Sequence, residues 1–266
     1  FATEAACRGY LTALRWPSGF RCPRCALHGD GWVTKRGMMM CAGCGHQTSV
    51  TAGTIFHRSH LPLRAWFRAM WWVTNQKHGV SALGLQRLLG LGSYETAWAC
   101  LQKLRRAMVR PGRDRLAGDV EVDETYVGGV RAGGGRRSLG NKALVAVAAQ
   151  VDGKGIGRIR LRRISDASSR SLQAFIADAI EPESRVITDG WEGYEGLAAR
   201  QYKHRAKVIR GSRKTASTVL PRVHRVASWL KRWLLGPHQG GVSREQLDYY
   251  LDEFTFRFNR RTSQYR

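Results

Sequence analysis

Hydrophobic positions change their spacing twice along the chain, and these changes divide it into three parts. Up to residue 56, short apolar runs separated by turns, as in "GWVTKRGMMM" and "CGHQTSVTAGTIF", predict small strands. From residue 57 the spacing becomes helical. After the polar junction "PGRDRLAGD" (111–119), apolar residues alternate and predict strands. We therefore expect domains at 1–56, 57–112 and 113–266.

The middle part is expected to be helical throughout. "LPLRAWFRAMWWVTNQKHG" has aromatic residues at helical spacing, predicted to face a core, and stops at His78-Gly79. "VSALGLQRLLGLGSYETAWACLQKLRRAMVR" then predicts a helix, a Gly-Leu-Gly turn and a second helix from Tyr94, with Ser93 as its N-cap. This arrangement is typical of a helix-turn-helix, although any helical hairpin has the same pattern. The side chains expected to contact DNA are Tyr94, Thr96, Lys103, Arg105 and Arg106.

The last part predicts an α/β domain. A strand in "VEVDETYVGG" is followed by a strand pair that turns at Asp152-Gly153 and by an amphipathic helix in "SRSLQAFIADAI". A short buried strand in "SRVITDGWEGY" precedes a helix that contains His224. This order of elements fits a mixed sheet flanked by helices.

Charge narrows the class of partner. The chain has 44 Lys and Arg against 20 Asp and Glu, a formal net charge of +24, which favours a polyanionic partner. No apolar run approaches the roughly 18 residues of a spanning helix, so a nucleic acid is favoured over a membrane. With the predicted helix-turn-helix, the expected partner is double-stranded DNA, and no small-molecule substrate is expected. The expected location is the cytoplasm. Further phosphate contacts are expected from two basic stretches, at Arg131, Arg136, Arg137 and Lys203.

Four of the six cysteines have the spacing of a metal site. They form C-x2-C-x15-C-x2-C, which lets two tight turns offer four thiolates to one ion, and they are Cys22, Cys25, Cys41 and Cys44. The spacing predicts a zinc ribbon with one structural Zn²⁺. The alternative, two disulfides, suits a small secreted protein better than a large basic chain. Cys7 and Cys100 are expected to be buried, unreactive thiols.

Two aspartates and a histidine form a candidate catalytic site. Asp123 lies in the first predicted strand of the α/β domain, and Asp189 ends the later one. Each has an ordinary alternative, since Asp189 could cap the turn at Gly190 and Asp123 could pair with an arginine. Together, aspartates on adjacent strands can hold two divalent cations ~3.5–4 Å apart for phosphoryl transfer. His224 could supply a third ligand, and Lys231, two helical turns later, could bind the reacting phosphate.

Several blocks of the sequence together resemble a known family. They are "CPRC…CAGCGHQTSVTAGTIF", "LPLRAWFRAM", "VEVDETYVGG", "VITDGWEGY", "VHRVASWLKRWLLGPHQGGVS" and "LDEFTFRFNRR". In this order they resemble bacterial insertion-sequence transposases of the ISXO type, within the DDE superfamily, whose catalytic core is RNase H-like. The resemblance implies that Asp123 and Asp189 are the first two catalytic acids and bind two Mg²⁺ or Mn²⁺ ions. At the third position, where the superfamily has glutamate, the resemblance points to His224, followed by Lys231.

Two glutamates bear on this assignment: Glu253 is an alternative third residue, and Glu124 is the neighbour of Asp123. Glu253, in the last predicted helix, could complete the site instead of His224, or could pair with Arg257 four residues on. Glu124 should point to the opposite face of the strand from Asp123 and is interpreted as structural.

The expected function is that of a DNA transposase acting at the nucleoid. It would bind the terminal inverted repeats of its element, cut the ends and join them to target DNA. Because an element has two ends, at least a homodimer is expected on DNA. Two alternatives remain open: a catalytically inactive, domesticated zinc-ribbon regulator, and a nuclease that cuts without joining.

Overall fold

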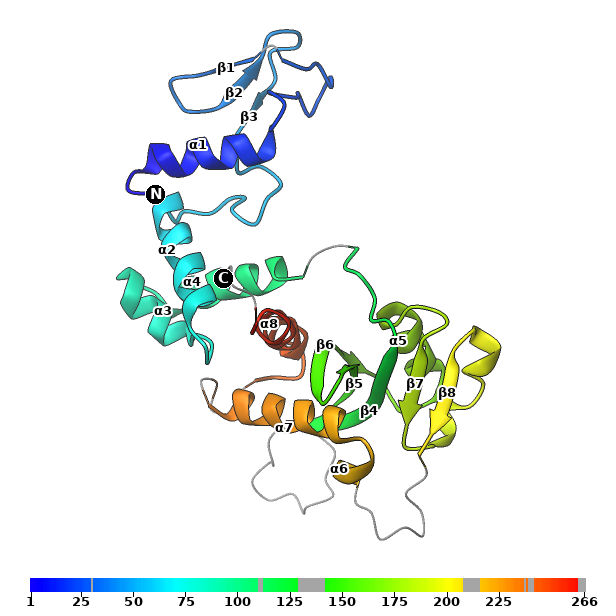
Figure 1. Ribbon diagram of the computed structural model, residues 1–266. Coiled ribbons are helices and arrows are strands. Elements are labelled where there is room, and N and C mark those ends of the chain that lie inside the picture. The colour runs from blue at the N-terminus through cyan, green and yellow to red at the C-terminus, as the bar shows by residue number, and fades with distance from the viewer. Residues whose placement is uncertain are drawn as a thin grey trace. The chain divides into compact units, whose positions relative to one another are not determined.

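The computed structural model describes residues 1–29, 31–109, 112–128, 142–207, 216–236, 238 and 242–262. They form two compact units (Figure 1). The first contains Phe1–Gln76 and Ala82–Leu104, and the second contains Lys77–Ser81 and Arg105–Arg266. The predicted domain boundaries at 56/57 and 112/113 stay predictions. None of the described helices is both long and apolar enough to cross a membrane.

The first unit combines a small sheet with helices. Its elements are α1 (Glu4–Arg15), β1 (Gly31–Val33), β2 (Met39–Cys41), β3 (Gln47–Thr48), α2 (Leu63–Asn75), α3 (Ala82–Leu89) and most of α4 (Tyr94–Ala107). The antiparallel order β1-β2-β3 has a very small core of Phe20, Cys22 and Cys41. Helix α1 had not been predicted.

The predicted helix-turn-helix elements are present as α3 and α4. Helix α4 begins at Tyr94 as predicted, and Ser93 caps it by accepting a hydrogen bond from the Thr96 N–H at 3.2 Å. In α2, Trp66 is buried as predicted, whereas Trp71 is 64% exposed and does not belong to the core.

The second unit is built on a five-stranded mixed sheet. Its elements are β4 (Asp119–Val127), β5 (Ala143–Asp152), β6 (Gly155–Ile164), α5 (Ser169–Ala179), β7 (Arg185–Thr188), the short 3-10 helices Glu192–Tyr194 and Ala198–Arg200, β8 (Lys203–Ala206), α6 (Ala216–Val219), α7 (Pro221–Leu235) and α8 (Leu247–Asn259). The order is β6-β5-β4-β7-β8, antiparallel between β6, β5 and β4 and parallel between β4, β7 and β8. The predicted fold class, an α/β RNase H-like domain preceded by a zinc ribbon and helices, is confirmed. Strand β8 had been interpreted only as a basic stretch.

Alternation along the strands gives the sheet two buried faces. On β5, Val145 and Val147 pack with the apolar faces of α7 and α8. Leu144 and Ala146 pack with α5 on the opposite face. Because β4 alternates in the same way, Asp123 and Glu121 lie on the face of α7, and Glu124 lies on the face of α5.

The core under α7 and α8 contains a histidine that should make stability depend on pH. The His238 ring packs against Trp233 and Tyr250 at 4.8 and 4.7 Å between centroids. Burial, with smaller effects of neighbouring arginines, lowers the pKa of His238 to about 4. The unfolded chain, with a pKa near 6.5, therefore binds more protons between the two values.

Stability is accordingly expected to fall as the pH is lowered from about 6.5 to about 4. Melting temperatures across this range would test it, with His238→Phe as the ring-preserving control. An equal slope in His238→Phe would assign the pH dependence to another group.

Candidate active site and zinc centre

The four paired cysteines converge on one point in the first unit. The Sγ atoms of Cys22 and Cys44 lie 3.7 Å apart, and those of Cys25 and Cys41 lie 3.6 Å apart. Thiolates arranged tetrahedrally around zinc at ~2.3 Å are about 3.8 Å from one another. The four ligand atoms all lie within 4.8 Å of one another, so the spacing matches a tetrahedral Zn–S4 centre. Cys7 and Cys100 are buried as predicted, and burial raises the pKa of Cys100 to about 12.

The parallel pairing of β4 with β7 brings the two predicted catalytic aspartates together. Glu121 pairs with Ile187, and two residues further along lie Asp123 on β4 and Asp189 directly after the end of β7. The Asp189 Oδ1 atom accepts the Trp191 N–H at 3.0 Å, so this aspartate does cap the glycine turn. Its Oδ2 atom makes no hydrogen bond to a described residue and remains available for a ligand.

Helix α7 places His224 over Asp123. The His224 Nε2 atom is buried, has no hydrogen-bond partner among the described residues, and lies 3.4 Å from Asp123 Oδ2. The other Asp123 oxygen accepts the Glu124 N–H at 2.9 Å. One imidazole nitrogen and one carboxylate oxygen therefore face each other without a hydrogen bond between them.

Glu121 fixes the start of α7 and thereby the position of His224. Its buried carboxylate accepts the backbone N–H groups of Arg222 at 2.7 Å and Val223 at 3.2 Å, in the first turn of the helix. The Arg222 guanidinium completes an ion pair with it at 3.0 Å. A carboxylate is favoured at a helix N-terminus by the free N–H groups and the helix dipole. This glutamate, two residues before Asp123, had no predicted role.

The cluster has the electrostatics of a cation site. Burial, then the negative charges of Glu124 and Asp189, raise the pKa of Asp123 to about 7. Burial lowers the pKa of His224, which keeps the imidazole neutral with a lone pair to donate. On the other face, Glu124 Oε2 accepts a hydrogen bond from the Tyr194 hydroxyl at 2.7 Å, consistent with its structural interpretation.

A divalent cation fits these residues in chemical type. Carboxylate oxygens suit Mg²⁺ and Mn²⁺, and an imidazole nitrogen favours Mn²⁺ relative to an all-carboxylate site. The unpaired buried Nε2 atom beside the Asp123 carboxylate is the observation that supports the fit. Among the described residues, only the four cysteines have three or more ligand atoms all within 4.8 Å. Asp123, Asp189 and His224 are therefore neighbours that would have to close further around an ion.

Lys231 is exposed and lies two turns after His224 on α7. Burial, and then the charge of Lys142, lower the pKa of Lys231. Lys142 is thus a second cation near Lys231.

Glu253, the competing third acid, is engaged elsewhere in the unit. Its carboxylate is 1% exposed and forms ion pairs at 2.7 Å with both Arg105 and Arg257. Burial alone would raise the pKa of Glu253, but these two arginines lower it below its ordinary value. The pairing with Arg257 is the predicted alternative to a catalytic role.

Removing the Glu253 carboxylate is expected to destabilise the second unit strongly. Glu253→Ala should lower the free energy of unfolding by about 3–5 kcal/mol, because two guanidinium groups lose their buried partner. Asp248→Ala is the matched control, since Asp248 lies on the same helix in an exposed pair with Arg163 and should cost at most about 1 kcal/mol. Urea denaturation of both variants measures the difference. Similar losses in the two would show that the buried pair contributes little.

The predicted DNA-contacting residues have mixed outcomes. Tyr94, Thr96 and Arg106 are exposed on α4, and Lys203 is exposed on β8. Lys103 is half-buried and donates to the His57 carbonyl at 3.3 Å. The prediction for Arg105 is wrong, because its guanidinium is 2% exposed, bound by Glu253 and 4.1 Å from the Tyr250 ring centroid. Arg131, Arg136 and Arg137 lie outside the described residues.

Two segments of the chain match known protein families. Residues 115–259 match the ISXO2-like transposase domain, and residues 2–47 match the transposase zinc-ribbon domain, which includes all four ligand cysteines. The chain is 28% identical over 279 aligned positions to an uncharacterized protein in transposable element ISH50 of Halobacterium salinarum, covering 97% of this chain and 91% of that protein.

Solved structures are more distant. A chain of the simian T-cell lymphotropic virus intasome with a PP2A regulatory subunit aligns at 13% identity and a TM-score of 0.36, over 71% of this chain and 65% of that one. The Mos1 transposase paired-end complex aligns at 12% identity and a TM-score of 0.31, over 71% and 73%. Similarity at this level carries no functional argument. The family match extends over more than half of the residues, and the chain belongs to the ISXO2-like transposases.

Proposed function

We propose that this protein is an active DNA transposase, which binds the terminal inverted repeats of its insertion sequence, cuts its ends and joins them to target DNA. The observation that carries the proposal is the meeting of three groups within the family-matched domain. Asp123 lies on β4, Asp189 directly follows the parallel strand β7 and its charge acts on Asp123, and the unpaired His224 Nε2 lies 3.4 Å from Asp123.

Each residue has a distinct role in this proposal. Asp123, Asp189 and His224 would bind the two catalytic Mg²⁺ or Mn²⁺ ions. When bound, such ions activate the attacking oxygen and stabilise the leaving one. Lys231 would hold the reacting phosphate, and Glu121 would position His224 by anchoring the first turn of α7.

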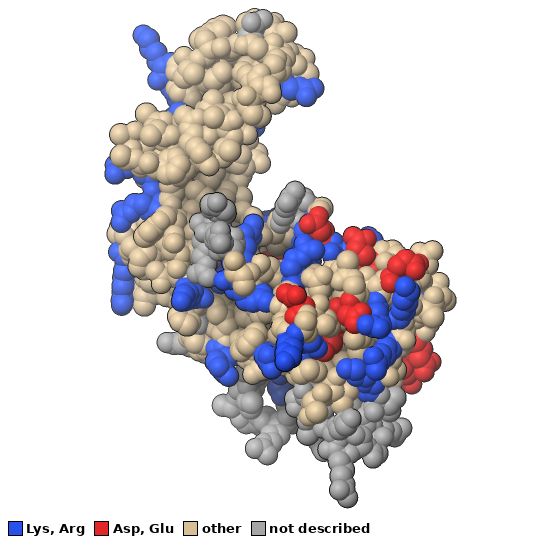
Figure 2. Space-filling model, in the orientation of Figure 1, with Lys and Arg blue, Asp and Glu red and all other residues tan. Residues whose placement is uncertain are grey.

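DNA binding would involve both units. The first 104 residues contain only three acidic residues, Glu4, Asp30 and Glu95. Figure 2 shows Lys and Arg side chains over both units, while the acidic side chains visible on this face gather on the second. Tyr94, Thr96 and Arg106 on α4 would contact the inverted repeat, with Lys103 nearby and Lys203 on phosphate. Two copies of the chain would hold the two ends at the nucleoid.

Cleavage and strand transfer on element-end DNA, in Mg²⁺ and in Mn²⁺, test the proposal. A transposase cuts at the element end and joins the freed 3′ end to target DNA. A domesticated regulator would bind the same DNA without cutting, and a nuclease would cut without joining. Binding with no cleavage in either metal would therefore overturn the proposal.

The affinity for DNA should fall steeply with salt. Each phosphate contact releases counterions, so six to ten contacts would reduce affinity by about 10³–10⁵ between ~50 and ~200 mM salt. Fluorescence anisotropy over a salt series would measure the slope, and Arg106→Ala should make it shallower by about one contact. A flat dependence would contradict a phosphate-dominated interface for this chain of net charge +24.

A further inference from the structure

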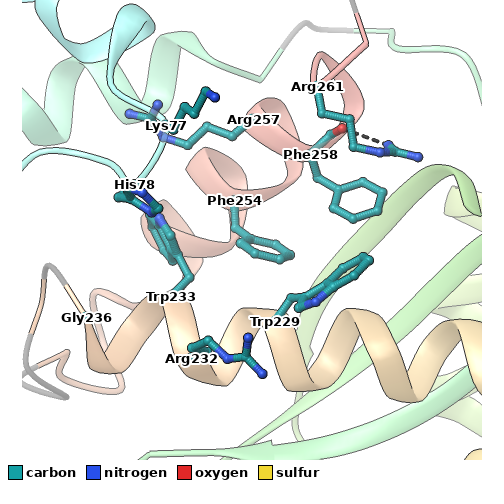
Figure 3. Close-up of a pocket in the computed structure, with 10 residues that line it drawn as sticks. All are labelled: Lys77, His78, Trp229, Arg232, Trp233, Gly236, Phe254, Arg257, Phe258 and Arg261. Atoms are coloured by element: carbon teal, nitrogen blue, oxygen red, sulfur yellow. Dashed lines mark hydrogen bonds between the residues drawn. The ribbon is translucent and has the colours of Figure 1, made fainter.

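A cavity of about 660 Å³ opens in the second unit between α7 and α8, apart from the aspartate cluster (Figure 3). Four aromatic side chains line it, Trp229 and Trp233 from α7 and Phe254 and Phe258 from α8. Its volume lies within the range of about 300–1,000 Å³ that is typical of ligand pockets.

The aromatic rings leave a planar surface open to a guest. Phe254 and Phe258 are buried, whereas Trp229 is 38% exposed and tilts 39° from Phe258 at 5.8 Å between centroids. The cavity wall therefore offers stacking surface, as a heteroaromatic guest requires.

All charged side chains at the cavity are basic. No Asp or Glu lines it, and among the described residues Lys77 and Arg232 make no ion pair with a carboxylate. Arg261 contributes a guanidinium 4.0 Å from the Phe258 ring centroid. Aromatic walls beside unneutralised cations are complementary to a nucleotide, whose base stacks and whose phosphate is anionic.

Helix α7 connects this cavity to the aspartate cluster. At 100° per residue, Trp229 and Trp233 lie roughly 140–180° around the helix from His224, on the opposite flank. Arg225 and Arg232, seven residues apart, are both exposed and lie on the surface between the two flanks. The helix is about 10–12 Å wide, so about three nucleotides at ~3.4 Å each would span it.

We propose that this cavity binds one unstacked base of a DNA strand that crosses α7. The base stacks on Trp229, and neighbouring phosphates contact Lys77, Arg225 and Arg232. This proposal rests on the proposed transposase function. It adds to that function a site in the second unit that binds a distorted, locally single-stranded DNA end. Each base of a strand has a phosphate beside it, so a DNA strand matches both the aromatic cavity and the cations around it.

The test compares two single strands of equal length and charge. Full-length, zinc-loaded protein is titrated, without added divalent cation, with fluorescein-labelled oligothymidylate and with the corresponding abasic strand. Wild type should bind the strand with bases about 5- to 100-fold more tightly, as expected for stacking of a base. Trp229→Leu keeps an apolar side chain on Phe258 but removes the stacking face, so it should lose at least about fivefold of this preference. Trp229→Phe should retain most of it.

Each outcome separates the base site from the transposase function. An unchanged preference in Trp229→Leu would overturn the base site, even if wild type cuts element-end DNA. A lost preference in Trp229→Leu, kept in Trp229→Phe, would support the site even if wild type failed to cut. Weaker binding of both strands by Arg232→Ala, with the preference kept, is expected of a phosphate contact, and no change would remove Arg232 from the proposal. Melting temperatures exclude misfolding as the cause.

Discussion

His224→Ala is expected to abolish cleavage and strand transfer while DNA binding survives. The imidazole Nε2 has no other partner among the described residues and lies 3.4 Å from Asp123 Oδ2, so its loss removes a ligand and no structural hydrogen bond. By comparison with groups that stabilise charge in other transition states, the rate should fall on the order of 10²–10³-fold or more. Gel assays of single-turnover cleavage in Mg²⁺ and Mn²⁺ would measure it.

Two further variants make this test specific. Ser228→Ala, one turn further along α7 and exposed, is the matched control and should cut at the wild-type rate. His224→Glu restores a carboxylate at the position, so it should recover part of the activity, more in Mg²⁺ than in Mn²⁺. Normal cleavage by His224→Ala would disprove the histidine's role and leave the site with two acids and an unidentified third ligand.

The aspartate pair was predictable because its signals are local. Alternating apolar residues around Asp123 predict a strand, and Asp189 directly precedes Gly190, whose φ of +84° favours glycine after the end of β7. The sequence could not predict the position of α7 over the sheet. Glu121 binds the first turn of α7 although about 100 residues of chain separate them, and no local pattern indicates such a contact.

The two main errors have the same physical origin. Arg105 was predicted to be exposed because isolated arginines usually are, but its partner Glu253 is 148 positions away in the sequence. Strand β8 was missed because an edge strand needs few apolar residues, and "KHRA" has only one position that is even half-buried among polar neighbours. Both cases depend on tertiary contacts that override local preference.

Removal of zinc is expected to unfold the ribbon completely while the second unit stays folded. Strands of three, three and two residues share a buried core of Phe20, Cys22 and Cys41, against which the half-buried Trp16 packs. So small an apolar cluster cannot offset the entropy of ordering the chain, and metal ligation must supply the difference. Cys41→Ser, in the buried half of the centre, should lose bound zinc from about one equivalent per chain to near zero.

Zinc content by atomic absorption and limited proteolysis of the ribbon would measure this loss. Cys100→Ser is the matched control, because Cys100 is an equally buried thiol outside the four-cysteine cluster. The Cys100→Ser protein should keep about one equivalent of zinc. If the ribbon resists protease without zinc, apolar packing must hold it and the metal is not structural. If the ribbon unfolds and element-end binding weakens while the second unit still melts as in wild type, the ribbon is a separately folding DNA-binding module, and zinc availability would control where the catalytic unit acts.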